Sequence, residues 1–348
     1  MTNTYFLGAN SARGFVSLYE NFAAADGDRL HVIKGGPGTG KSGFMRKIGA
    51  AAEKRGYDVE YVLCSGDPDS LDGVYIPALK QAWVDGTAPH LLDPAPFGAV
   101  GDYVNIGQFC RLPLLEEDRQ EVLRLNRAYK ELYDRAYAYL AAAAALRRAS
   151  VPAFWHGETA RNAERRVSAI LRRHTVSRHA QGRLSKRFLS ALSCRGHLRL
   201  SGEISVLCKL SYCLDDALLL AAPALTHAAQ EALSRGLDVI LCPSPLCPEE
   251  PEAVLLPQEG LALLRGGWEL PETRNVRLDA LVPAQLQRDN RSEMRAGRRL
   301  EDAALDAALE KLRQAKELHD ALEAVYRPYM DFAALTDFTQ REIARIFG

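Results

Sequence analysis

The residues with the clearest chemical meaning lie in VIKGGPGTGKSGFM, residues 32–45. The spacing G-x-x-x-x-G-K-[ST], typical of a phosphate-binding loop, is met by Gly35, Gly40, Lys41 and Ser42. In such a loop, glycines let successive backbone N–H groups turn toward phosphate oxygens. Its lysine reaches the β- and γ-phosphates, and its serine holds Mg²⁺. The expected phosphate-binding residues are Gly35, Gly36, Pro37, Gly38, Thr39, Gly40, Lys41 and Ser42.

An acidic residue must also hold the magnesium ion from the end of a neighbouring strand. The segment QAWVDGTAPH, residues 81–90, contains a short apolar run that ends in Asp85 and is followed by a Gly-Thr turn. We therefore expect Asp85 to hold Mg²⁺ together with Ser42. The alternative is that Asp85 only caps the turn after its strand. His90 is a further candidate for a contact with the γ-phosphate, although a lone histidine is more often structural.

A second acidic cluster, GDPDSLDG at residues 66–73, places Asp67, Asp69 and Asp72 in the loop after the second strand. In open α/β sheets, loops at the carboxyl ends of strands border the ligand crevice. We take Asp67 as a candidate catalytic acid, which would position an acceptor hydroxyl, orient a water or hold Mg²⁺ in place of Asp85. The alternative is that the Asp-Pro-Asp-Ser run forms an Asx turn and caps the next element.

The elements needed to position the phosphate loop are also predicted. RLHVIK, residues 29–34, is a short apolar run of strand-forming residues. After Lys41, a helical stripe includes Phe44, Met45 and Ile48. A strand, a glycine turn and a helix are the context in which this motif binds phosphate.

The chain also repeats itself. YFLGANSARGF (5–15) aligns with RFLSALSCRGH (187–197), and KRGYDVEYVLC (54–64) aligns with SRGLDVILCPS (234–244) at nearly the same offset. Collinear matches of this kind indicate an internal duplication. Each copy alternates strands with helices, which predicts an α/β fold whose parallel sheet is flanked by helices on both faces.

Each copy ends in a predicted long helix, at about residues 115–146 and 300–326. Both helices carry a heptad-like seam of apolar residues. We expect the two helices to pair with each other within the chain, because that arrangement needs no second molecule.

The second copy has lost its phosphate loop. Asp215 and Asp216 align with Gly35 and Gly36, and no lysine follows them. Arg265 stands at the position that aligns with Asp85. Two carboxylates would face an incoming phosphate, so we expect that this copy cannot hold a nucleotide in the same way.

We divide the chain into a P-loop domain at 1–146, a basic helical linker at 147–186 and a degenerate P-loop-like domain at 187–348. From residue 147 to residue 187 the sequence has eleven Arg or Lys but only two acidic residues. The favoured interpretation is a solvated connecting helix. The alternatives are an arginine that reaches the γ-phosphate or, less favoured, a surface that binds a nucleic-acid backbone.

The 348 residues carry a formal net charge of zero, with 47% hydrophobic and 25% charged residues. This composition is typical of a soluble globular protein. The first residues lack a basic-then-apolar secretory pattern, and no apolar run reaches the roughly 18 residues needed to span a membrane. Seven cysteines in so long a chain fit a reducing compartment. We expect a cytoplasmic protein without a membrane partner.

KGGPGTGKS, CSGDPDSLDG and VDGTAPH, together with the duplication, resemble an uncharacterised bacterial family of tandem P-loop ATP-binding proteins. The resemblance covers essentially the whole chain. It implies a P-loop fold and binding of ATP with Mg²⁺, and it supplies no established substrate. The second copy in that family often carries its own phosphate loop, which this chain lacks.

The expected function is that of an ATPase with one Mg·ATP site beside a degenerate copy, in which hydrolysis drives a conformational change or partner binding. One alternative is a small-molecule kinase that holds an acceptor hydroxyl at residues 66–73. Another is a nucleotide-gated scaffold with little turnover and an unidentified protein partner. A GTPase is less favoured, because no Asn-Lys-x-Asp motif follows the phosphate loop.

Overall fold

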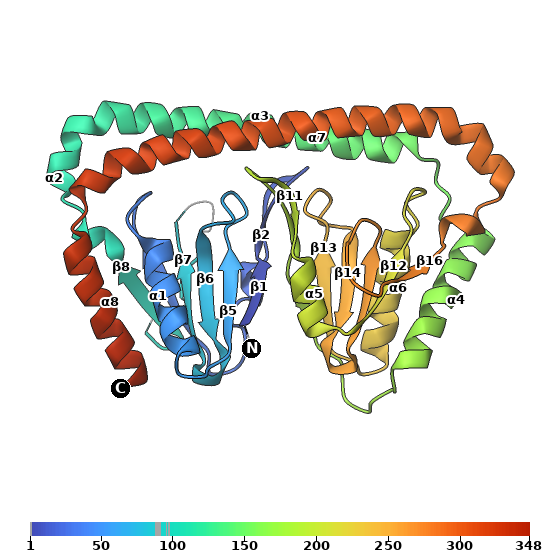
Figure 1. Cartoon of the computed structure of the whole chain (residues 1–348), viewed down its shortest axis with the longest axis horizontal. Coiled ribbons are helices and arrows are strands. Elements are labelled where there is room, and N and C mark those ends of the chain that lie inside the picture. Colours follow the sequence, from blue (N-terminus) through green and yellow to red (C-terminus); the bar gives the residue numbers. More distant parts are fainter. Residues whose placement is uncertain (1, 88–91, 95, 97) are drawn as a thin grey trace.

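The computed structural model describes residues 2–87, 92–94, 96 and 98–348. Two six-stranded sheets lie side by side, and two long helices run across both of them (Figure 1). We call the sheet unit of β1–β8 the first half and that of β9–β16 the second half. No helix in the described ranges is long and apolar enough to cross a lipid bilayer.

The first half begins with a strand and a hairpin, and its sheet is completed before the first long helix begins. Its strands are β1 (Thr2–Phe6), β2 (Gly8–Ser11), β3 (Gly14–Ser17), β4 (Arg29–Lys34), β5 (Val59–Leu63), β6 (Leu71–Ile76), β7 (Gln81–Asp85) and β8 (Gly101–Asn105). The helices up to the second half are α1 (Lys41–Glu53), α2 (Leu112–Leu115), α3 (Arg119–Ser150) and α4 (Gly157–His174).

The second half repeats this order of elements. Its strands are β9 (Leu184–Lys186), β10 (Ser190–Ser193), β11 (Gly196–Arg199), β12 (Leu210–Leu214), β13 (Val239–Pro243), β14 (Pro251–Leu256), β15 (Leu261–Arg265) and β16 (Arg274–Val276). Its helices are α5 (Ser201–Leu207), α6 (Ala221–Ser234), α7 (Ala284–Tyr326) and α8 (Phe332–Phe347).

Both sheets are mixed rather than parallel. The strand order is β1-β5-β6-β7-β4-β8 in the first half and β9-β13-β14-β15-β12-β16 in the second. β6 and β14 run antiparallel to both of their neighbours, and the remaining pairs are parallel. The prediction of a parallel sheet is therefore wrong at these two strands. The connection at residues 64–70 is too short for the crossover of a dozen or more residues that a parallel pair requires.

The predicted duplication is confirmed by equivalent elements in the two halves. Phe6 and Phe188, which are equivalent in the repeat, bond to each other through both backbone N–H groups, at 2.9 and 2.8 Å. Phe6 ends β1 and Phe188 follows β9, and these two strands are the edges of their sheets. An approximate twofold axis therefore passes between the halves.

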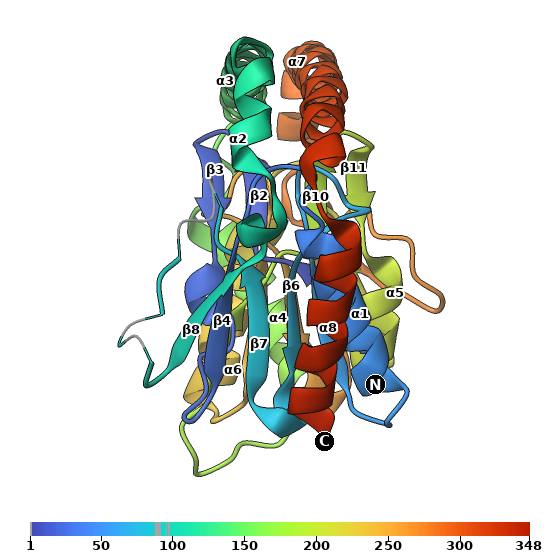
Figure 2. The same ribbon diagram turned by 90° about the vertical axis from the view of Figure 1, so that its left-hand side faces the viewer.

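The two long helices lie side by side and antiparallel above the sheets, as Figures 1 and 2 show. Small and apolar residues fill their interface, including Ala136 and Leu140 of α3 and Leu312 of α7. The prediction of intramolecular pairing is confirmed.

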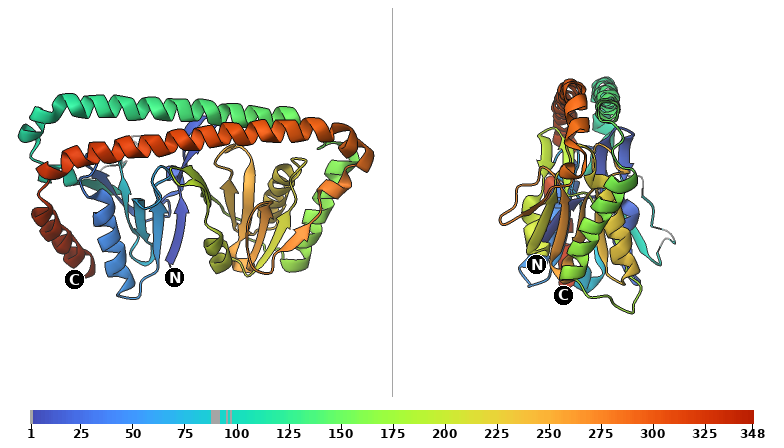
Figure 3. Two further views of the ribbon diagram at one scale, coloured as in Figure 1. Left: turned by 45° about the horizontal axis from the view of Figure 1, so that its top comes forward. Right: turned by 90° about the vertical axis from the view of Figure 1, so that its right-hand side faces the viewer.

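Each long helix carries the chain across to the opposite half. After α3, helix α4 packs on α6 of the second half, and after α7, helix α8 packs on α1 of the first half (Figure 3). The Phe44 and Phe338 rings, for example, stack with centroids 5.9 Å apart. Val167 and Leu171 of α4 are fully buried in the core of the second half. Much of the segment expected to be a solvated linker is therefore a packed helix.

The two faces of each sheet are covered differently. In the first half, Ile33 and Trp83 face the core that includes α1 and α8. On the opposite face, Val32 and Val84 belong to a second cluster that contains Phe22 and residues of both halves. Helices were expected on both faces; in the first half, α1 and α8 cover one face, and the other packs in a cluster shared by both halves.

Candidate nucleotide-binding site

The glycine loop closes between β4 and α1, as the sequence predicts. Gly38 and Gly40 have φ of +66° and +90°, in the left-handed region that favours glycine. Thr39 is buried, and its hydroxyl donates to the carbonyl oxygen of Gly36 at 2.8 Å. Helix α1 begins at Lys41, so the loop opens directly onto the N-terminus of a helix.

Lys41 and Asp85 are brought together at the mouth of the loop. The ammonium of Lys41 donates to the carbonyls of Gly36 at 2.8 Å and Gly35 at 3.1 Å, and lies 3.6 Å from Oδ2 of Asp85. Asp85 ends β7, the neighbour of β4 in the sheet. Its other oxygen, Oδ1, accepts from the backbone N and the hydroxyl of Thr87. One oxygen therefore caps the turn, and the other faces the lysine.

Ser42 is the second residue of α1. Its Oγ accepts from the backbone N of Leu71 at 2.9 Å, which ties the start of β6 to this helix. A hydroxyl oxygen with one such bond still has a lone pair for a cation. In the part of the chain that the structure describes, no three His, Cys, Asp or Glu side chains form a metal-binding group. Mg²⁺ commonly binds one or two protein ligands together with waters and phosphates, which a Ser42 and Asp85 pair would fit.

The acidic segment 66–73 is held by contacts of its own. Oδ1 of Asp67 accepts from the backbone N of Asp69 at 3.3 Å, and its Oδ2 accepts from Ser70 at 2.9 Å. Asp67 thus forms the Asx turn that was the alternative to a catalytic role. Asp72 was expected in the loop but lies in β6, where it is buried and accepts from the hydroxyl of Tyr19 at 3.1 Å. Burial, together with the charge of Asp72, raises the pKa of Tyr19 well above 10.

The second half covers the phosphate loop with the end of α7 and with α8. A β-carbon added at Gly38 would lie 3.0 Å from the carbonyl oxygen of Glu323, and one added at Gly36 would lie 3.0 Å from the ring of Tyr326. At Gly40 the nearest atom would be a methyl of Leu335, at 2.9 Å. Gly38 and Gly40 are therefore required both by their positive φ and by the close approach of the helices, and Gly36 by the close approach alone.

Cationic side chains of the second half also reach the acidic segment. Lys316 of α7 lies 3.5 Å from Asp67, and Arg195 of the β10–β11 hairpin pairs with Asp69. Burial alone would lower the pKa of Lys316, but Asp320 and Asp67 raise it. Burial lowers the pKa of His319, and the charge of Glu323 partly opposes this.

Sequence reasoning did not identify these contributions from the second half, because no local pattern specifies which half a distant helix will contact. It sought an arginine for the γ-phosphate in the basic segment 147–186. In the structure α4, which makes up much of that segment, lies at the far end of the second half (Figure 1). His90, the other candidate, lies outside the described residues.

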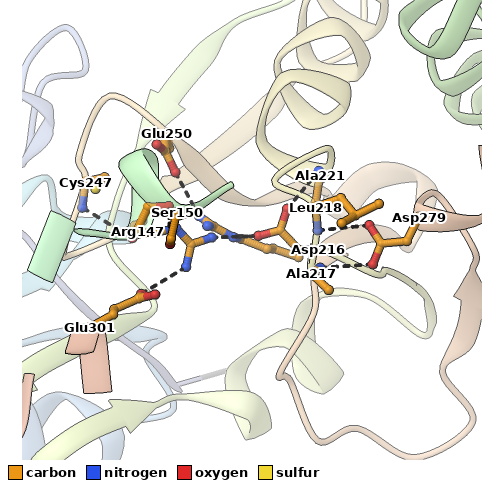
Figure 4. A network of polar contacts seen from close by, with 12 residues as sticks. Arg147, Ser150, Asp216, Ala217, Leu218, Ala221, Cys247, Glu250, Asp279 and Glu301 are labelled. Atoms are coloured by element: carbon orange, nitrogen blue, oxygen red, sulfur yellow. Dashed lines mark hydrogen bonds and ion pairs between the residues drawn. The ribbon is translucent and has the colours of Figure 1, made fainter. Parts of the chain in front are cut away.

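In the equivalent loop of the second half, an acidic residue replaces a loop glycine and a basic residue replaces the aspartate at the end of the strand. Asp216 occupies the place of Gly36, and Arg265 ends β15 as Asp85 ends β7. Oδ2 of Asp216 accepts from Arg265 at 2.5 Å. It also accepts from Arg147 of α3 at 2.8 Å (Figure 4). The two carboxylates were expected to face the loop uncompensated, but two arginines neutralise Asp216.

Carboxylates also accept hydrogen bonds from the backbone amides of this second loop. Asp279 accepts from the backbone N of Ala217 at 3.0 Å and of Leu218 at 3.2 Å, and Asp216 accepts from that of Ala221 at 2.9 Å (Figure 4). Within the described residues, no carboxylate accepts from the amides of residues 35–42. The amides of the first loop therefore lack the carboxylate acceptors that the second loop has.

No protein-family model matches this chain, and neither a curated protein nor a solved structure matches it.

Proposed function

We propose that the protein binds Mg·ATP at residues 35–42 and hydrolyses it at this one site. The observation that supports the proposal is the contrast between the two loops. In the first loop, Lys41 and Asp85 lie beside amides that no carboxylate of the described residues engages, whereas in the second loop carboxylates accept from the amides.

The residues of the first loop have distinct roles in this proposal. Its backbone N–H groups and the N-terminus of α1 bind the phosphate oxygens. Lys41 leaves the carbonyls of Gly35 and Gly36 and neutralises the β- and γ-phosphates. Ser42 and Asp85 would hold the magnesium ion, which supplies further neutralisation of the transferring phosphoryl group.

The position of α7 supports coupling of nucleotide binding to a conformational change. Glu323 and Tyr326 lie against the loop, so a bound phosphate chain acts on the end of a helix that spans both halves. The start of this helix reaches the second half, where Glu301 lies 3.5 Å from Arg147. Changes at the first loop can therefore be transmitted along a single rigid element.

The kinase alternative has less support. Asp67 is engaged by its own turn and by Lys316, and Asp69 pairs with Arg195. These contacts hold both carboxylates in place within the loop and with cations, which supports a structural role for them. The scaffold alternative differs from an ATPase only in turnover, and the experiment below measures turnover directly.

Calorimetric titration with Mg·ATP tests the binding site. Lys41→Ala should abolish binding, while Lys54→Ala, at an exposed lysine just after α1, should leave it unchanged. Titration with Mg·GTP measures the base preference. Normal ATP binding by Lys41→Ala would show that the site lies elsewhere.

Phosphate release measures turnover. We expect Asp85→Asn to lower it by at least about tenfold, since the metal loses its carboxylate. A library of metabolites, added to wild type and Asp85→Asn side by side, separates the functions. Turnover that requires a metabolite would favour the kinase, and binding without turnover under any condition would favour the scaffold.

A further inference from the structure

A groove of about 420 Å³ lies between the first turns of α7 and the degenerate loop of the second half. Its lining includes the loop residues Ala217 and Leu218. It also includes Asp279, whose carboxylate accepts hydrogen bonds from the amides of these two residues. Figure 4 shows these three residues facing one another. The groove belongs to the second half and is distinct from the loop at residues 35–42.

The α7 side of the groove is a stripe of four arginines, Arg288, Arg291, Arg295 and Arg298. They are spaced three or four residues apart, so neighbouring side chains leave the same face of the helix about 5–6 Å apart. All four are exposed. Among the described residues they form no ion pair, and only Arg288 donates to another side chain, that of Gln285.

The charge of the groove is strongly positive. Asp279 is the only acidic residue that lines it in the described part of the chain, and its two oxygens already accept from the loop amides. Four exposed guanidinium groups that form no ion pair among the described residues repel one another and attract an anion, although the charge of Arg298 also acts on Asp279 and Glu301. Structural arginines elsewhere in this half, such as Arg265 and Arg147, are paired with carboxylates.

We propose that this groove binds a small anion that carries two or more phosphate groups. Guanidinium groups bind phosphate oxygens in pairs of parallel hydrogen bonds. The stripe extends over about 15 Å of helix, so a single phosphate would reach only part of it. The volume of the groove lies within the range of small-molecule sites, which favours a compact ligand over a polymer.

The groove also continues toward the interior of the second half. Ala217, Asp279 and Arg298 line both this groove and a neighbouring cavity of about 570 Å³ that contains Arg147 and Arg265. A phosphate at the inner end of the arginine stripe lies next to the amides that Asp279 occupies. The proposal does not depend on nucleotide binding in the first half.

Inorganic pyrophosphate is a suitable probe, with Lys41→Ala as the background that removes the first loop from the measurement. Titration calorimetry of the full chain should detect pyrophosphate binding in Lys41→Ala. Adding Arg291→Gln and Arg295→Gln should weaken it by at least about tenfold, through the loss of charge-assisted hydrogen bonds. The matched control is Arg299→Gln, an exposed arginine of α7 that does not line the groove.

A second variant tests the position of the ligand, because it should strengthen pyrophosphate binding whereas the arginine substitutions should weaken it. Asp279→Asn removes the one negative charge of the groove and should strengthen pyrophosphate binding. Binding that is absent in Lys41→Ala, or equal in the Arg291/Arg295 variant and the Arg299 control, would overturn the proposal. It would also be overturned if a short RNA duplex bound the same arginines and displaced pyrophosphate at far lower concentration, since the site would then serve a polymer.

Discussion

Glu252 allows a direct test of how burial changes the pKa of a carboxyl group in the second half. It lies in β14, is 5% exposed and has no arginine or lysine among its hydrogen-bonding partners in the described residues. Its Oε1 accepts from the hydroxyl of Ser190 at 2.6 Å. Burial raises the pKa of Glu252 from its ordinary value of 4.5 to about 7, and the Ser190 hydrogen bond and the charge of Arg199 only partly oppose this.

The raised pKa fixes the sign of the effect on stability. Between pH 4.5 and 7 the folded protein holds a proton on Glu252 that the unfolded chain has already lost, so stability falls as the pH rises through this range. Below pH 4.5 both states are protonated, and the cost is absent. A pKa difference of about 2.5 corresponds to about 3 kcal/mol when the cost is complete, above pH 7.

Glu252→Gln removes this ionisation while keeping the acceptor oxygen for Ser190. Urea unfolding measures the unfolding free energy of the variant and of wild type at each pH. Relative to wild type, the variant should be about 3 kcal/mol more stable at pH 8 than it is at pH 4.5. Comparing two pH values cancels any fixed cost of burying the amide. Glu293→Gln, at an exposed glutamate of α7, is the control and should shift neither value appreciably. Parallel pH profiles for wild type and Glu252→Gln would refute the reasoning.

Two further predictions concern the two loops. Gly38→Ala should destabilise the protein and weaken Mg·ATP binding, because the new methyl would crowd the carbonyl oxygen of Glu323 at a positive φ. Gly43→Ala, in open space within α1, should instead stabilise the protein by about 0.5–1 kcal/mol in the same thermal unfolding assay; equal effects of the two changes would contradict this. Asp216→Ala should lower the unfolding free energy by about 1–3 kcal/mol, because buried Arg265 and partly buried Arg147 lose their shared carboxylate but keep Glu250 and Glu301 as partners. Calorimetry should find its Mg·ATP affinity unchanged, and a lost affinity would argue against one independent site.

Local patterns predicted the elements around the phosphate loop well. A strand, a glycine turn and a helix are specified within about 20 residues, and the duplication follows from alignment alone. The direction of β6 was predicted wrongly, although the short connection at residues 64–70 already excluded a parallel crossover. The length of this connection is therefore a signal for strand direction that the sequence itself contains.

Other features have no local signal. The apolar stripe of α8 predicts that the helix packs on something, but not that its partner is α1 of the first half. In the same way, nothing in the sequence distinguishes Arg147 from the other basic residues near it. Its hydrogen bond to Asp216 depends on the path of α3. Contacts between residues far apart in sequence depend on the topology of the whole chain, so the covering of both loops could not be predicted.

The exchange of helices between the halves has a consequence for biosynthesis. Phe44 of α1 packs against Phe338 of α8, so the outer surface of α1 stays bare until the ribosome has made almost 300 further residues. At about 5–20 residues per second, this interval lasts on the order of 15–60 s. During it the nascent first half exposes the apolar side of α1 that α8 later covers, and exposed apolar surface of this kind favours aggregation.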